Sequence, residues 1–163
     1  TFDNIRAFEA ASHSRIEGIT IIVDNADTDN QAIYANDVTD FLINDVVIEY
    51  TDNGTDTFAI EADGTSSINI FNTKIYGASS PDAGIYVNSV TASIEASNTL
   101  MTGFSAGARA DAGEIITTYS HLHTNTHDFY VGNSANASIE SKDDRYLSVE
   151  FAGTAGYLSL IHI

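Results

Sequence analysis

Short apolar segments with a period-two alternation recur along the chain at intervals of 22 to 27 residues. The first set of segments is centred on six apolar residues that we align as equivalent: Ile16, Phe41, Ile68, Ile94, Ile116 and Ile139. Apolar residues that alternate with polar ones are typical of strands with one buried face. A repeat of this length indicates one coil of a solenoid.

A second strand is expected about 17 residues into each coil, with apolar first and third residues around a mostly polar middle residue. These segments are residues 8–10, 33–35, 60–62, 85–87, 108–110 and 129–131. A third short strand completes a three-sided coil at residues 46–48, 73–75 and 99–101. Short strands rich in Ile, Val and Thr argue against a helical solenoid, and parallel crossovers are right-handed. We therefore predict an all-β, right-handed parallel β-helix with three short strands per coil and about six coils.

Residues that tolerate left-handed backbone angles mark two corners of each coil. The column that follows the second strand consists of Asn36, Asp63, Asn88, Asp111 and Gly132. The column between the first and third strands consists of Asp45, Asn72, Asn98, Ser120 and Asp143. The same sharp corner is therefore expected once per coil.

The two corner columns resemble the asparagine ladder of pectate-lyase-like β-helices, and residues 83–89, AGIYVNS, resemble the generic repeat of that superfamily. The resemblance covers about residues 5–152. The superfamily includes polysaccharide lyases and hydrolases, phage tailspikes, adhesins and surface-layer proteins. The resemblance thus implies a location outside the cell or on the surface of a cell or virion, and it favours glycan chemistry without choosing among these functions.

Charge narrows the range of partners, because 23 acidic residues oppose six basic ones and give a net charge of -17. The negative electrostatic field of such a chain repels nucleic acid and anionic membranes. A chain with this charge is suited to binding cations or neutral glycans, or to a high-salt environment. No apolar run approaches the roughly 20 residues that a membrane helix needs. We expect no nucleic-acid partner and no membrane insertion.

Both ends of the chain bear on its domain organisation. Residues 158–163 resemble a translated sequencing-library adapter, and we predict that they are a non-native tail. Residues 1–157 are then a β-helix segment, which we interpret as a fragment of a longer protein. Because solenoids need capped ends, a homo-oligomer or flanking β-helix coils are expected.

The middle residues of the second strands are expected to point outward in one stacked column. Rungs lie about 4.8 Å apart, so tyrosines on alternate rungs would be about 9.6 Å apart, near the length of two sugar units. Aromatic rings offer apolar faces to sugars, and charged groups offer hydrogen bonds. The candidate glycan-binding residues are Tyr34, Glu61, Tyr86, Arg109 and Tyr130. Alternatively, tyrosine simply favours strands and covers the neighbouring rungs.

Two acidic loops on successive coils are candidates for a Ca²⁺ site, because this ion prefers six to eight oxygen ligands. The candidate ligands are Asp24, Asp27, Asp29, Asp52 and Asp56. The alternative is a solvated acidic edge. No cofactor is required, and Ca²⁺ is the candidate ion.

Three histidines suggest a different metal site. On a strand, His121 and His123 would share one face, as in a two-histidine metal site. A third ligand is not identifiable, and His127 lies further along the chain. Since Leu122 is expected in the core, the alternative is that both histidines point to solvent.

No catalytic residue is identifiable. Glycan cleavage requires two carboxylates across a groove, or the Ca²⁺ and basic residue of the lyases. We therefore expect an extracellular or surface segment that binds polysaccharide. The alternatives are a structural spacer or stalk of an adhesin, surface-layer protein or tailspike, and a fragment of a polysaccharide lyase or glycoside hydrolase.

Overall fold

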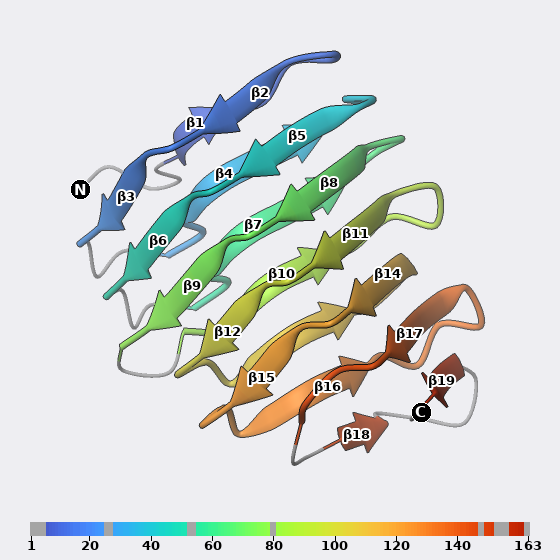
Figure 1. Ribbon diagram of the computed structural model, residues 1–163. Coiled ribbons are helices and arrows are strands. Elements are labelled where there is room, and N and C mark those ends of the chain that lie inside the picture. Colours follow the sequence, from blue (N-terminus) through green and yellow to red (C-terminus); the bar gives the residue numbers. More distant parts are fainter. Residues whose placement is uncertain are drawn as a thin grey trace.

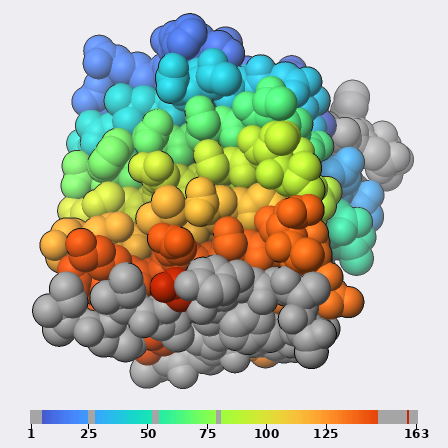
Figure 2. Space-filling model, turned by 90° about the vertical axis from the view of Figure 1, so that its right-hand side faces the viewer, coloured from blue at the N-terminus to red at the C-terminus, as the bar shows by residue number. Residues whose placement is uncertain are grey.

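The computed structural model describes residues 6–24, 28–51, 55–78, 81–146, 149–151 and 157–161. Within these ranges the chain forms strands and turns and no helix. The strands build three parallel sheets, stacked as about five turns of a right-handed parallel β-helix. Figure 1 shows successive coils as rungs, and Figure 2 shows the same coils as bands of surface from blue to orange. The predicted fold is confirmed.

Sheet A lies behind the other two sheets in Figure 1 and contains the strands predicted as the second strand of each coil. Its strands are β1 (Arg6–Glu9), β4 (Gln31–Asn36), β7 (Phe58–Asp63), β10 (Ala83–Val87), β13 (Ala106–Ala110), β16 (His127–Val131) and β18 (Val149–Phe151).

Sheet B contains the strands predicted as the first strand of each coil. Its strands are β2 (Arg15–Glu17), β5 (Phe41–Asn44), β8 (Ser67–Phe71), β11 (Ser93–Ser97), β14 (Gly113–Thr118), β17 (Ala137–Lys142) and β19 (Tyr157–Ile161). β19 includes residues predicted to be a non-native tail, and it pairs with β17. The origin of that tail stays a prediction.

Sheet C follows sheet B after a shallow bend in each coil. Its strands are β3 (Thr20–Val23), β6 (Val47–Tyr50), β9 (Lys74–Gly77), β12 (Leu100–Thr102) and β15 (His121–His123). Five coils therefore have strands in all three sheets, and β16 to β19 continue sheets A and B beyond them.

The core consists of stacked columns of apolar side chains, one from each sheet. In sheet A the inward column consists of Ile33, Ile60, Ile85, Ala108 and Phe129, all fully buried. In sheet C it includes Ile48, Ile75, Met101 and Leu122, also fully buried. Because each inward residue packs on its equivalent in the next coil, burial of apolar area holds the coils in register. The described residues include no helix with the length and apolar character that a membrane crossing requires.

The register of sheet B differs from the sequence alignment at two positions. Ile16 pairs with Ile43 rather than with Phe41. In β14, Ile115 rather than Ile116 is equivalent to Ile94. Ile115 is fully buried. Ile115 and Ile116 are both apolar, so the alternation of apolar and polar residues is lost at this point and the sequence does not indicate which one faces inward.

The corner between sheets B and C is left-handed as predicted, with φ of 52° at Asp45, 51° at Asn72, 50° at Asn98 and 56° at Asp143. In β14's coil the corner residue is Tyr119, with φ of 51°, and not Ser120. The side chains around this corner form a ladder of hydrogen bonds across coils. Asn72 Nδ2 donates to Asn44 Oδ1 at 3.1 Å, and Asn98 Nδ2 donates to Asn72 Oδ1 at 2.8 Å.

The other predicted corner column lies in register at the end of sheet A but is not left-handed. The positive φ values fall one residue later, at Asp37 and Gly64, in two coils. The connections from sheet A to sheet B vary from two residues, at 111–112, to five, at 88–92. Connections of different length cannot share one backbone conformation, which explains the difference.

Candidate functional site

The predicted column of middle residues runs along the outer face of sheet A. Neighbouring strands pair residue for residue in the predicted register, Glu9 with Tyr34, Tyr34 with Glu61, Glu61 with Tyr86, Tyr86 with Arg109, and Arg109 with Tyr130. The inward residues on either side of the column in β4 to β16 are buried. The arrangement of the candidate glycan-binding residues is therefore confirmed, while their binding of glycan stays a prediction.

The column is less exposed than the sequence predicts. Tyr34, Glu61 and Tyr86 keep only 9%, 8% and 6% of their surface exposed. Arg109 and Tyr130 are partly buried. The cause is that large side chains on adjacent rungs cover one another, which was the alternative left open for the tyrosines.

Aromatic rings and guanidinium groups pack against one another along most of the column, and two of these groups come from neighbouring positions of sheet A. The guanidinium carbon of Arg6 lies 3.6 Å from the centre of the Tyr34 ring. Phe58 stacks on Tyr86 with ring centroids 4.0 Å apart. The guanidinium carbon of Arg109 lies 5.2 Å from the ring centres of both Tyr86 and Tyr130. Such contacts make the face of the sheet a rigid platform.

Asp111, directly after β13, fixes two members of the column. Its Oδ2 atom accepts a hydrogen bond from the Tyr86 hydroxyl at 3.1 Å and from Arg109 Nη2 at 2.5 Å. Burial, and then the charge of Asp111, raises the pKa of Tyr86 above its usual value. The Tyr86 hydroxyl is therefore protonated at all physiological pH values and acts as a donor to Asp111.

A hollow of about 460 Å³ opens on the outer face of sheet A beside the column. The sheet and its end supply Phe58, Glu61, Tyr86 and Asn88 to this hollow, and two loops supply Thr28, Asp29, Thr55 and Asp56. The hollow thus combines an apolar floor with hydroxyl, amide and carboxyl groups. Two predicted candidates, Glu61 and Tyr86, lie in it.

The described loop residues that line the hollow belong to two connections that are longer than the others between sheets C and A. Residues 24–30 and 51–57 are seven-residue connections, whereas residues 103–105 and 124–126 are three-residue connections. The N–H of Asp29 donates to the carbonyl of Thr55 at 3.0 Å, so the loops stack on each other. Asp29 also accepts a hydrogen bond from Gln31 Nε2 at 3.0 Å, which fixes its carboxylate.

Glu61 is the most unusual group in the hollow. It is 8% exposed, and within the described part of the chain its carboxyl group has no hydrogen bond or ion pair. Burial, followed by the charges of Asp63 and Asp29, raises the pKa of Glu61 to about 7. Arg6 acts in the opposite direction with a smaller effect. A buried carboxyl without a partner is costly, and a ligand that supplies a partner would relieve that cost.

The predicted calcium ligands are only partly described. Asp29 and Asp56 meet at the hollow. Asp24 accepts a hydrogen bond from the Thr51 hydroxyl at 2.9 Å. Asp27 and Asp52 lie outside the described residues. Among the residues that the structure describes, no three acidic or histidine side chains are grouped to hold a metal ion, and the calcium site stays a prediction.

His121 and His123 share one face of β15, as expected for alternate residues of a strand. Their ring centroids are 4.6 Å apart, and Leu122 between them is fully buried. His127 lies on β16 of another sheet. In the described ranges these histidines are not part of a group of three metal ligands.

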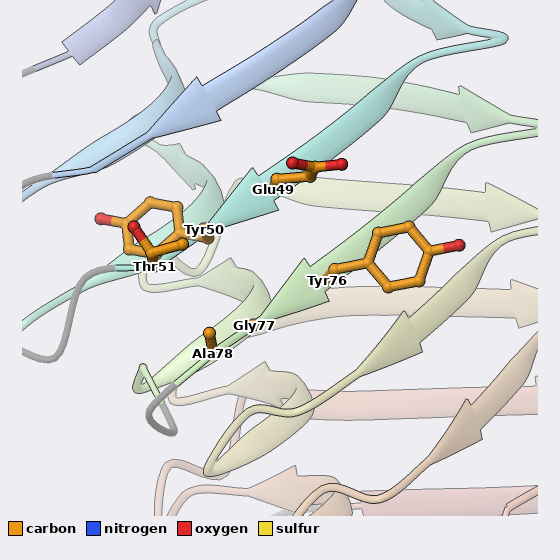
Figure 3. A pocket seen from close by; sticks show the side chains of 6 residues that line it. All are labelled: Glu49, Tyr50, Thr51, Tyr76, Gly77 and Ala78. Atoms are coloured by element: carbon orange, nitrogen blue, oxygen red, sulfur yellow. The ribbon is translucent and has the colours of Figure 1, made fainter.

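A second hollow, of about 470 Å³, lies on sheet C and was not predicted. Glu49 and Tyr76 are paired across β6 and β9 and face it together. Figure 3 shows Tyr76 on one side of the sheet and Tyr50 on the other. Tyr50 is fully buried and donates from its hydroxyl to the carbonyl of Asn30 at 2.5 Å. Of the two tyrosines that line this hollow only Tyr76 is partly exposed, and the carboxylate of Glu49 is exposed to solvent, so the hollow offers fewer fixed groups than the hollow on sheet A.

Sequence reasoning missed Phe58 and Asp111 as parts of the site. Phe58 lies two residues before the first inward residue of β7, where the next two coils have Ala83 and Ala106 and the preceding coil has Gln31. An apolar aromatic residue at a position where the other coils have alanine or a polar residue was the available signal. Asp111 was assigned to the corner column, and only the structure shows that its carboxylate returns to the face of sheet A.

No family model matches the sequence, and neither a curated protein nor a solved structure matches the chain.

Proposed function

We propose that this chain is a β-helix segment of an extracellular or surface protein that binds polysaccharide on the outer face of sheet A. The observation that carries the proposal is the stacked pair Phe58 and Tyr86 in one hollow with the carboxyl of Glu61, which has no hydrogen bond or ion pair among the residues that the structure describes. Ligand pockets typically have volumes of about 300 to 1,000 Å³ and combine apolar surface with a few fixed polar groups. The volume of the hollow lies in this range, and the small exposed parts of Phe58 and Tyr86 give it an apolar floor among polar groups.

The lining groups suit a sugar ring. Sugars present C–H groups on their faces and hydroxyls around their edges, so they need apolar contact and hydrogen bonds together. Phe58 and Tyr86 supply the apolar floor, and their mutual stacking holds them in place before a ligand arrives. The hydroxyls of Thr28 and Thr55 lie at the rim, where they can donate and accept hydrogen bonds.

The rungs beyond the hollow extend the surface in a direction that suits a chain of sugars. Arg109 and Tyr130 follow Tyr86 on successive strands and are partly exposed. From the rung of Glu61 to that of Tyr130 is a distance of about 14 Å, at about 4.8 Å per rung. A ligand of about three sugar units that lay parallel to the solenoid axis would contact all four rungs.

Binding to a glycan array, at low and high salt, tests the proposal. The informative variant combines Thr28→Ala, Thr55→Ala and Asn88→Ala, which change the rim and leave the packed floor intact. The matched control combines Asn69→Ala, Ser93→Ala and Thr118→Ala on the outer face of sheet B. Circular dichroism establishes that each protein is folded.

We expect selective binding by the wild type, loss of binding in the rim variant and retention in the control. If the folded wild type binds no glycan at either salt concentration, the proposal is rejected. A spacer or stalk is then the better interpretation, and the regular ladder of Asn44, Asn72 and Asn98 along the solenoid is the feature that favours it.

A further inference from the structure

We propose that the hollow on sheet A selects glycans that carry protonated amino groups, and that Glu61 is the carboxyl group that receives the ammonium. This inference rests on the proposed glycan binding and specifies the class of sugar.

The described residues that line the hollow include acidic groups and no basic one. Asp29, Asp56 and Glu61 are among them, and none of the described lining residues is a lysine, arginine or histidine. The two arginines of sheet A have other contacts. Arg6 lies over Tyr34 and donates to Gln31 Oε1 at 3.3 Å, and Arg109 is paired with Asp111. A uronate would therefore be repelled, and a cationic sugar would be attracted.

Glu61 supplies an observation independent of this charge cluster. Its side chain lines the hollow, is more than nine-tenths buried and has no hydrogen bond or ion pair among the described residues. Asp29, in contrast, has its own donor in Gln31. A buried acceptor without a donor loses hydration on folding and regains nothing within the protein. A donor from a ligand would be favoured at this position.

An ammonium group fits the acceptors better than a metal ion does. Calcium prefers six to eight oxygen ligands, whereas in the described part of the chain no three acidic or histidine side chains are grouped to hold a metal ion. An ammonium has three donors. The carboxyl of Glu61 and the hydroxyls of Thr28 and Thr55 are acceptors of the kind that it needs.

Binding of an ammonium is coupled to ionisation of Glu61. The groups that face Glu61 are Asp63 on its own strand, Asp29 and Asp56 on the loops, Arg6 on β1 and the flanking Tyr34 and Tyr86. Because its pKa is raised to about 7, the free protein holds a proton on Glu61 at slightly acidic pH. A bound ammonium favours the carboxylate, so complex formation releases that proton, and affinity rises with pH as long as the amine of the sugar stays protonated.

The test compares two hexasaccharides with the same β-linked backbone by isothermal titration calorimetry, one of glucosamine and one of N-acetylglucosamine. Titrations at about pH 6 in two buffers with different ionisation enthalpies count the protons released. Glu61→Gln removes the carboxylate and conserves shape. Glu95→Gln, on the exposed outer face of sheet B, removes the same charge away from the hollow and is the control.

We expect the glucosamine oligomer to bind at least about tenfold more tightly than the acetylated one, with release of a proton. In Glu61→Gln this preference and the proton release should be lost, while Glu95→Gln changes affinity less than about twofold. Equal binding of both oligomers, or an equal effect of the two substitutions, would overturn the inference and leave glycan binding intact. If neither oligomer nor any array glycan binds, the proposed function fails as well.

Discussion

The ring of Phe58 stacks on the ring of Tyr86 one strand away, with a centroid separation of 4.0 Å and an angle of 25° between the planes. The pair fits because the residues next to it in the sheet, Ala83 and Ala106, are small. Together with Tyr130 they form an apolar cluster that is separate from the core of the solenoid. This cluster is the floor of the candidate site, so its packing contributes both to folding and to the shape of the hollow.

Replacing Phe58 by alanine should lower the free energy of unfolding by about 3 kcal/mol, because the buried ring and its stacking contact with Tyr86 are lost. Phe58→Leu, which retains apolar volume, should cost about 1 kcal/mol. Urea denaturation measures both. Phe71→Ala on the outer face of sheet B is the control, since Phe71 is 41% exposed. An effect of Phe71→Ala as large as that of Phe58→Ala would contradict the separate packing of the cluster.

The raised pKa of Glu61 makes stability depend on pH in a defined direction. Glu61 has a pKa of about 7 in the folded protein and about 4.5 when unfolded. The folded state therefore holds a proton that the unfolded state loses between these values, and this group lowers the free energy of unfolding as pH rises from 4.5 to 7. The full loss is up to about 3 kcal/mol and is constant above that window.

Glu61→Gln isolates this contribution from those of the other carboxyl groups. The stability of the variant relative to wild type should rise by up to about 3 kcal/mol from acidic to neutral pH. Chemical denaturation at a series of pH values gives the difference. A difference that is independent of pH would show that the pKa of Glu61 is not raised in the folded chain.

The ladder residue Asn72 combines a left-handed backbone with two hydrogen bonds to other coils. Its φ is 51°, it donates to Asn44 and it accepts from Asn98. Asn72→Ala should destabilise the protein by about 2 kcal/mol, through both losses. Asn72→Gly relieves the backbone and should cost about half as much. Thermal unfolding of the two variants separates these causes, and equal destabilisation would exclude a backbone contribution.

Asp144 is a buried carboxylate with three donors. It is 5% exposed and accepts from the hydroxyls of Thr117 at 2.5 Å and Ser141 at 2.6 Å, and from the N–H of Ser120 at 2.6 Å. Asp144→Ala leaves these donors without an acceptor and should cost about 3 kcal/mol or more. Asp144→Asn should cost less, because the two hydroxyls can rotate to accept from the amide. Urea denaturation checks the order, and a neutral effect of Asp144→Ala would contradict the role of this network.

Most of the fold was predictable from the sequence because the alternation is well marked in sheet A. Each inward aliphatic or aromatic residue there is followed by a polar or tyrosine residue, and the predicted pairing is correct at every rung from Phe8 to Phe129. In sheet B the pattern is weaker. Ile115 and Ile116 are adjacent, so the pattern alone placed the wrong one in the core.

The candidate site was predictable in part. The order of Tyr34, Glu61, Tyr86 and Arg109 along the sheet follows from the repeat, but their burial depends on contacts between side chains that a single sequence does not reveal. Asp29 and Asp56 were singled out as calcium ligands on separate grounds. The structure places both residues beside the face that the tyrosines occupy, in the seven-residue connections that precede β4 and β7.

The unequal loops between sheets C and A have a consequence for how this surface can change. Each loop leaves and re-enters the solenoid at fixed corners, so its length adds little to the constraints on the coil. Insertions and deletions there can be accepted one coil at a time while the stacked strands persist. The three-residue turns at 103–105 and 124–126 are accordingly the places where selection or engineering could insert longer loops beside sheet A. Such loops would extend the binding surface, so that it could contact a longer glycan.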